Sequence, residues 1–151
     1  MAKVSLPKWC SIVRSNPAAY ERDAFSLPQI LSPSDAAAFV RPTLQHQDVE
    51  VFLVVSLNAQ HRAIGVTKVT TGLVDSSLVH PRETFRVAIA MGASAIFVAH
   101  NHPIGDPTAS VADRSVTEQL VAAGRILDIP VFDHIIIAGN RWSSFAQNGF
   151  L

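Results

Sequence analysis

The sequence predicts a single α/β domain, because patterns typical of buried strands alternate along it with patterns typical of amphipathic helices. The chain has 151 residues, of which 48% are hydrophobic and 16% are charged. A chain of this size can bury one hydrophobic core and is too short for two comfortable domains. We therefore expect one globular domain at residues 48–151, preceded at residues 1–47 by an N-terminal arm with short helices.

The arm contains one clear helix start. Ser32 precedes Pro33 and Asp35; serine is a preferred helix cap, and proline suits the first helical position. The apolar residues 36–40 follow. Pro42 should end or bend this helix, because proline has no backbone donor for the helical hydrogen bonds.

Two strands should open the domain. Residues 50–57 are almost continuously apolar and rich in valine, which is typical of a strand covered on both faces. Residues 58–61 have the composition of a turn, and residues 63–70 follow as a second strand pattern. Because the connection is short, the two strands should pair as a hairpin.

The remaining segments alternate between helix and strand. Residues 81–91 carry apolar side chains at helical spacing, and residues 95–99 form a short apolar run. A loop rich in proline and glycine then leads to Ser110, which begins a second amphipathic helix. Residues 131–138 are a further apolar strand, and residues 142–145 are a last short strand or a tail.

The most specific pattern in the sequence follows the run at residues 95–99. His100 and His102 are two residues apart on an extended segment, so both side chains point to one face and can reach one ion. Asp113 supplies a carboxylate from further along the chain. Three nitrogen and oxygen ligands with no cysteine nearby leave a fourth position for water, which is the arrangement of catalytic zinc. The pattern therefore predicts a hydrolytic Zn²⁺ site.

Ser110 and Asp113 also match a capping box, in which the acid reaches back to a backbone N–H at the helix start. The histidine pair just upstream favours the ligand role for Asp113. Ser110 can act as the helix cap, as a donor into the site, or as both. As a donor, its hydroxyl would stabilise the oxyanion that forms when water attacks a carbonyl.

A hydrolytic zinc site needs a general base, and glutamate is the usual choice. The candidates are Glu50, at the head of the first core strand, and Glu83, in the first turn of the helix that follows. Glu83 has an ordinary explanation as an acid at a helix N-terminus, so the spacing favours Glu50 slightly. Asp133 and His134, in the last apolar strand, are expected to be structural; orientation of a metal ligand is the alternative.

Together these residues resemble a known family. The histidine pair, the seven residues after it and the Ser-x-x-Asp sequence match, without a gap, the JAMM motif of JAB/MPN-domain metalloproteases. The neighbouring residues resemble the RadC branch of that superfamily. The segments that carry this narrower likeness are Pro81-Arg82-Glu83, Ala99-His100-Asn101-His102-Pro103, Gly105-Asp106-Pro107 and Asp133-His134.

The resemblance runs over residues 48–151 and implies a single RadC-like JAB/MPN metallohydrolase domain, with a cytidine-deaminase-like mixed β-sheet flanked by helices. RadC proteins often carry an N-terminal helix-hairpin-helix region. The sequence ahead of Asp48 is too short for one, so we expect the short, stand-alone form. Ile104 and Ala109 stand where relatives usually have serine and proline. Ile104 is not a ligand position, so these departures concern the shape of the loop and the fit of the substrate.

The resemblance also implies a function and a role for each site residue. Zinc would be held by His100, His102 and Asp113. Glu50 takes the place of the JAMM glutamate, and the resemblance therefore clearly favours Glu50 over Glu83 as the general base. The implied activity is that of a zinc metallopeptidase acting on a peptide or protein substrate, including isopeptide-linked proteins. Water activated by the metal and Glu50 would attack the carbonyl, while Ser110 helps to hold the oxyanion.

Composition argues against several other classes. Twelve basic and twelve acidic residues give a net charge of zero, which is not the electrostatic footprint of a nucleic-acid binder. A DNA repair or DNA-processing factor therefore remains only an alternative, as does a non-catalytic metal-binding MPN scaffold. Cys10 is the single cysteine; it cannot supply the cysteine pair of a deaminase, and it fits a reducing compartment. With no signal-like start and no membrane-length apolar run, we expect a cytoplasmic protein.

Overall fold

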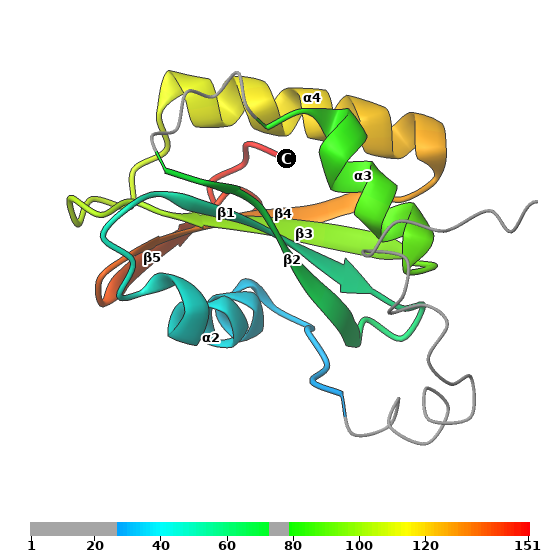
Figure 1. Cartoon of the computed structure of the whole chain (residues 1–151), viewed down its shortest axis with the longest axis horizontal. Coiled ribbons are helices and arrows are strands. Elements are labelled where there is room, and N and C mark those ends of the chain that lie inside the picture. Colours follow the sequence, from blue (N-terminus) through cyan, green and yellow to red (C-terminus); the bar gives the residue numbers. More distant parts are fainter. Residues whose placement is uncertain (1–26, 73–78) are drawn as a thin grey trace, which may run out of the picture.

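A five-stranded mixed sheet organises the part of the chain that the structure, a computed structural model, describes: residues 27–72 and 79–151 (Figure 1). The order across the sheet is β2-β1-β3-β4-β5. β3 and β4 are parallel, and the other three pairs of neighbours are antiparallel. The strands are β1 (Val51–Leu57), β2 (Ala63–Thr71), β3 (Ala95–Asn101), β4 (Val131–Ala138) and β5 (Arg141–Ser144).

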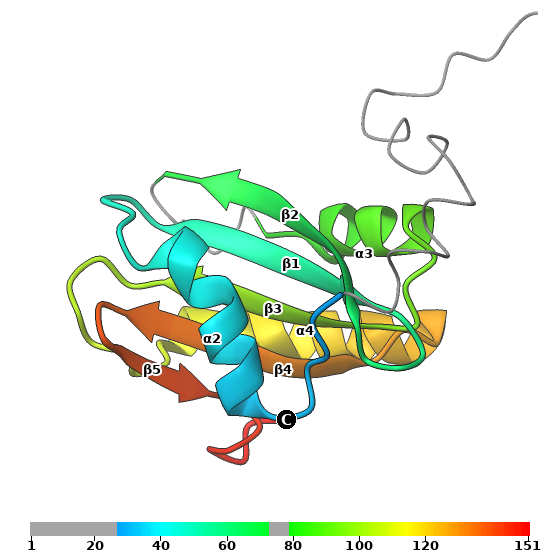
Figure 2. The same ribbon diagram turned by 90° about the horizontal axis from the view of Figure 1, so that it is seen from below.

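Among the described residues, three helices cover the two faces of the sheet. α3 (Pro81–Ala90) and α4 (Val111–Leu127) lie on one face, and α2 (Pro33–Leu44) lies on the other (Figures 1 and 2). α4 connects the parallel strands β3 and β4, because such a pair needs a long crossover. This arrangement confirms the predicted α/β class with a mixed sheet flanked by helices.

The central strands are buried on both faces, as their apolar sequences predict. Every residue of β1 and of β3 is buried. Side chains alternate along β1: Leu53 and Val55 pack in the cluster that includes α2, whereas Phe52 and Val54 pack in the cluster that includes α3 and α4. The predicted β1–β2 hairpin is observed, and the last apolar segment is a short strand rather than a tail.

Helix α2 begins where the sequence predicts. The Ser32 hydroxyl accepts a hydrogen bond from the Asp35 backbone N–H at 3.1 Å, and proline occupies the first turn. The helix continues past Pro42 to Leu44, so the end predicted at Pro42 is not observed. Proline removes its own hydrogen bond to the preceding turn, and the helix ends two residues later.

α2 lies in the segment that we assigned to the N-terminal arm. Ala36, Ala37, Val40 and Leu44 are buried in the core cluster on this side of the sheet. The helix therefore covers apolar side chains of β1, β3 and β4. The boundary between arm and domain at residue 48 stays a prediction. Cys10 and most of the arm lie outside the described residues.

None of the described helices combines the length and apolarity needed to cross a membrane.

Replacing Leu44 with alanine should lower the free energy of unfolding by about 2–5 kcal/mol, the usual range for a fully buried leucine. Leu44 is 1% exposed, whereas Leu31, just ahead of the helix, is 68% exposed. Leu31→Ala is therefore the matched control and should change stability by less than about 0.5 kcal/mol. Chemical denaturation of both variants measures the difference, and equal losses would contradict the packing of α2 on the sheet.

Candidate metal centre

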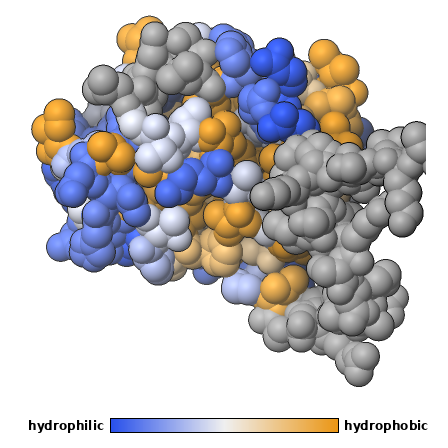
Figure 3. All heavy atoms as spheres, in the orientation of Figure 1, coloured by the Kyte–Doolittle hydropathy of each residue, from blue (hydrophilic) through white to orange (hydrophobic). Residues whose placement is uncertain are grey.

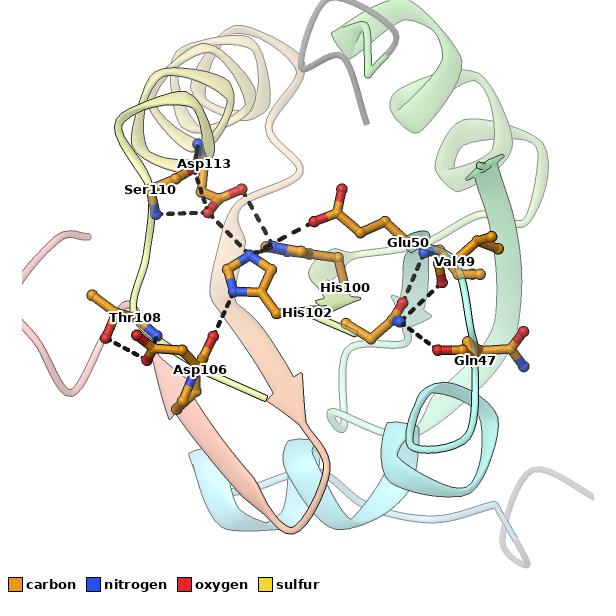
Figure 4. Close-up of polar contacts among 12 residues, drawn as sticks. Gln47, Val49, Glu50, His100, His102, Asp106, Thr108, Ser110 and Asp113 are labelled. Atoms are coloured by element: carbon orange, nitrogen blue, oxygen red, sulfur yellow. Dashed lines mark hydrogen bonds and ion pairs between the residues drawn. The ribbon is translucent and has the colours of Figure 1, made fainter. Parts of the chain in front are cut away.

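Four polar side chains converge at one end of the sheet. His100 and His102 come from the end of β3, Asp113 comes from the first turn of α4, and Glu50 immediately precedes β1 (Figure 4). The antiparallel register pairs Phe52 with His100, so the residue two positions before Phe52 lies beside the residue two positions after His100. Pairing of the strands therefore brings Glu50 beside His102, although 52 positions separate them in the sequence.

Three of these side chains form a compact group of possible metal ligands. His100 Nε2 lies 2.9 Å from His102 Nε2 and 3.3 Å from Asp113 Oδ1. His102 Nε2 lies 3.5 Å from Asp113 Oδ2. The ligand atoms all lie within 4.8 Å of one another, close enough for one ion to contact all three.

The hydrogen bonds around His102 test whether this group suits a cation. His102 Nδ1 lies 2.7 Å from the carbonyl oxygen of Asp106; a carbonyl only accepts, so Nδ1 carries the proton. In the neutral ring, Nε2 then presents a lone pair toward His100 and toward the negative carboxylate of Asp113. A shared cation relieves the repulsion in such a cluster of acceptors, so the three residues fit a metal ion.

Burial and neighbouring polar groups shift the pKa of each candidate ligand. Burial lowers the pKa of His100 to about 4, so this imidazole is neutral at pH 7, as a metal ligand must be. The hydrogen bond to Asp113 raises the pKa of His102 and outweighs the effect of burial. Burial alone would raise the pKa of Asp113, but hydrogen bonds and the nearby histidines lower it below its usual range.

Asp113 caps the helix and faces the histidines at the same time. Its Oδ2 accepts hydrogen bonds from the backbone N–H and the hydroxyl of Ser110, both at 2.7 Å, and the Ser110 hydroxyl accepts from the Asp113 N–H at 3.0 Å. Its Oδ1 is the oxygen that lies near His100. The capping and ligand interpretations are thus compatible, and the hydroxyl proton of Ser110 is directed to the carboxylate.

The two glutamates have different neighbours. Glu50 Oε1 lies 4.0 Å from His102 Nε2, and its side chain extends toward the histidines (Figure 4). Glu83 forms ion pairs with Arg82 at 3.1 Å and with Arg86 at 2.7 Å. Among the described contacts, Glu50 is therefore the candidate base that reaches the metal group, and Glu83 belongs to a charged cluster on α3.

Comparison with known proteins agrees with this geometry. Residues 30–150 match the family model for the RadC-like JAB domain. The chain belongs to this family. The resemblance inferred from the His-x-His and Ser-x-x-Asp sequences is thereby confirmed.

Relatives of this RadC-like JAB domain are longer proteins. A UPF0758 protein of Symbiobacterium thermophilum is 43% identical over 122 residues, which cover 81% of this chain and 52% of the relative. A UPF0758 protein of Desulfitobacterium hafniense is 44% identical over 129 residues, which cover 85% of this chain and 57% of the relative. The chain therefore spans just over half the length of these relatives.

The asparagine between the two histidines has a role that sequence analysis did not assign. Asn101 is 2% exposed. Its side-chain oxygen accepts from the Val51 N–H at 2.8 Å, and its amide donates to the carbonyl oxygens of Val49 at 3.0 Å and Gln47 at 3.4 Å. These bonds hold the backbone on both sides of Glu50. Alternation along β3 was the available signal, because it turns Asn101 away from the histidines.

The loop after His102 is held by its own side chains. The carboxylate of Asp106 accepts hydrogen bonds from the backbone N–H of Thr108 at 3.0 Å and from its hydroxyl at 2.7 Å. The carbonyl of Asp106 is the partner of the His102 ring. Arg141, on β5, donates to the carbonyl of Gly105. This loop therefore orients the His102 imidazole from outside the sheet.

The side chains of Asp133 and His134 have different hydrogen-bond partners. The carboxylate of Asp133 accepts from the Ser144 hydroxyl at 2.6 Å and the Ala146 N–H at 3.0 Å, so it is structural as expected. His134 Nε2 lies 2.8 Å from His100 Nδ1. His134 therefore contacts a candidate ligand, because β4 lies beside β3, and this contact favours the alternative that His134 orients a ligand.

Asn101→Ala should lower the free energy of unfolding by about 1–3 kcal/mol, because it leaves the buried Val51 N–H without its acceptor. Asn148→Ala removes the same amide from an exposed position near the C-terminus and should have little effect. Urea denaturation compares the two variants. A loss for Asn101→Ala no larger than that for Asn148→Ala would show that the amide does not hold this segment.

Proposed function

We propose that this RadC-like JAB domain is a cytoplasmic zinc-dependent hydrolase that cleaves a peptide or isopeptide bond. The observation that carries the proposal is the convergence of His100, His102 and Asp113 with the carboxylate of Glu50, which lies 4.0 Å from His102 Nε2. A group of nitrogen and oxygen ligands beside a carboxylate able to carry a proton is the minimum set for metal-assisted hydrolysis.

The donor set favours zinc over other metals. Two imidazoles and one carboxylate suit zinc, and three protein ligands leave a position for water or substrate. Bound zinc would lower the pKa of water and polarise a carbonyl oxygen. The chain's own contribution is to keep His100 neutral, to orient both imidazoles and to fix the carboxylate of Asp113 through Ser110.

Glu50 is placed to move a proton. Its carboxylate would take a proton from the attacking water and deliver it to the leaving amine when the bond to the carbonyl carbon breaks. Asn101 supports this role, because it fixes the backbone of residues 49 and 51. The hydrogen bonds of Asn101 therefore fix the position of the backbone that carries the Glu50 carboxylate.

Ser110 would stabilise the oxyanion by donating a hydrogen bond from its hydroxyl. The hydroxyl donates to Asp113 Oδ2 at 2.7 Å. Rotation about the Cβ–Oγ bond can redirect this proton to a substrate oxygen that becomes negative, while Oγ continues to accept from the Asp113 N–H. The helix cap and the oxyanion contact are then two uses of one side chain.

The surroundings of the metal group support a peptide substrate. Ile104, in the loop after the histidines, is 98% exposed, and Val111, at the start of α4, is 86% exposed. On the face shown in Figure 3, separate hydrophobic side chains lie among hydrophilic ones. Such a surface offers both kinds of contact that an extended polypeptide makes, whereas the zero net charge gives no support for a nucleic-acid substrate.

The purified protein should contain about one zinc ion per chain, by the expected 1:1 stoichiometry of a three-ligand site. His100→Ala and Asp113→Asn should both lose the metal, because each removes a ligand. His46→Ala, which changes an exposed histidine outside the group, is the control and should keep it. Elemental mass spectrometry measures all four proteins, and wild type free of stoichiometric metal after purification without chelators would contradict the metal site.

Glu50→Gln should keep zinc and lose at least about 100-fold in turnover, the usual contribution of a general base. Glu83→Gln is the control and should remain active. Turnover is measured on a library of fluorogenic peptides together with isopeptide-linked lysine substrates. Activity retained by Glu50→Gln would overturn its role as the base; zinc-loaded wild type with no turnover on the whole library would favour the non-catalytic scaffold.

A further inference from the structure

A buried series of hydrogen bonds connects the backbone of Asp113 to His100 through the side chains of Thr117 and His134. The Thr117 hydroxyl lies 2.6 Å from the backbone carbonyl oxygen of Asp113, one turn earlier on α4. The same hydroxyl lies 2.6 Å from His134 Nδ1 on β4. His134 Nε2 lies 2.8 Å from His100 Nδ1 on β3. Three elements of the fold are thus joined through side chains.

The chemistry of each partner sets the direction of every bond. The carbonyl of Asp113 only accepts, so Thr117 must donate its single hydroxyl proton there. The Thr117 oxygen can then only accept from His134, so Nδ1 of His134 carries the ring proton. His134 Nε2 is left as an acceptor and takes a hydrogen bond from Nδ1–H of His100. The Nε2 of His100 therefore bears a lone pair, and this is the atom that faces His102 and Asp113.

The surroundings leave this arrangement little freedom. Thr117 is 1% exposed, His134 is fully buried and His100 is 2% exposed. The His134 ring stacks on Phe145, with centroids 4.5 Å apart, and forms a T-shaped contact with Phe52, with centroids 5.5 Å apart. Buried polar groups without partners are costly, so the rings cannot turn away without a loss of stability.

We propose that Thr117 and His134 are positioning residues that hold His100 in the tautomer with its proton on Nδ1, so that its Nε2 lone pair is ready for a metal ion. The consequence for metal binding rests on the proposed metal site. The tautomer itself is a property of the metal-free protein. Because the series begins at the carbonyl of Asp113, it also ties the helical turn that carries one candidate ligand to the strand that carries the other two.

The first test compares Thr117→Val with Thr117→Ser in the metal-free protein. Valine keeps the shape of threonine but removes the hydroxyl, so His134 Nδ1–H loses its acceptor, and the proton is expected to move to Nε2. His134 then donates to His100, whose own proton moves to its Nε2. Serine keeps the hydroxyl and should keep the wild-type tautomer. Correlation spectra of protons and nitrogens in the histidine rings, assigned with single histidine variants, report which nitrogen is protonated.

The second test measures zinc affinity by competition with a chromophoric chelator. Thr117→Val should bind zinc about 10–100-fold more weakly, as is usual when a residue that orients a ligand is lost. Thr117→Ser should bind nearly as wild type does. Thr84→Val is the matched control, because Thr84 is also fully buried and its hydroxyl has no hydrogen-bond partner among the described residues. It removes a hydroxyl from α3 without touching the series.

The outcomes separate this inference from the proposed function. A wild-type tautomer in Thr117→Val, or zinc affinity no weaker than that of Thr84→Val, would overturn the positioning role. Wild type that binds no zinc would refute the metal site, and the tautomer comparison alone would then decide the inference. If Thr117→Val does not fold, His134→Gln and His134→Met replace it: glutamine keeps an acceptor for His100 and should preserve the tautomer, whereas methionine should lose it.

Discussion

Strand β3 must be buried on both faces and must also find hydrogen-bond partners for the polar side chains at its end, and the candidate site depends on those partners. Its apolar residues are buried on both faces between β1 and β4, yet its end carries polar side chains that need partners. Alternation sends His100 and His102 to the face of α4 and sends Asn101 to the other. Each then finds its partner on a different neighbour: His134 on β4 for one histidine, and the backbone around Glu50 for the asparagine.

The same placement concentrates acceptors in a small volume. Two imidazole nitrogens and a carboxylate lie within 4.8 Å of one another, and the outer hydrogen bonds of both rings turn lone pairs inward. Without a cation, the site relies on protons: the raised pKa of His102, beside Asp113, is the response of the metal-free protein. A metal that binds only the folded state would replace that proton and add to stability. Folding and metal binding are therefore expected to be linked.

Much of this could be predicted from the sequence, for local reasons. Short-range patterns predict the strands, the caps at Ser32 and Ser110 and the His-x-His pair. Each of these patterns depends on residues that are close together in the sequence. The choice of Glu50 over Glu83 needed the register of β1 against β3, which no local pattern contains; family resemblance supplied it. The link from Thr117 to His134 was missed because it joins a helix to a strand seventeen residues later. Asp133 and His134 are adjacent in the sequence, but the strand turns them to different partners.

The double role of Asp113 explains why the helix start and the site cannot be altered separately. One carboxylate oxygen accepts both hydrogen bonds from Ser110, and the other faces His100. A change at Ser110 would therefore weaken the cap of α4 and free the carboxylate to rotate, even if the hydroxyl never touched a substrate. Loss of activity in a Ser110 variant is evidence for an oxyanion contact only if zinc affinity is kept. That comparison separates a group that holds the ligand from one that acts on the reacting carbonyl.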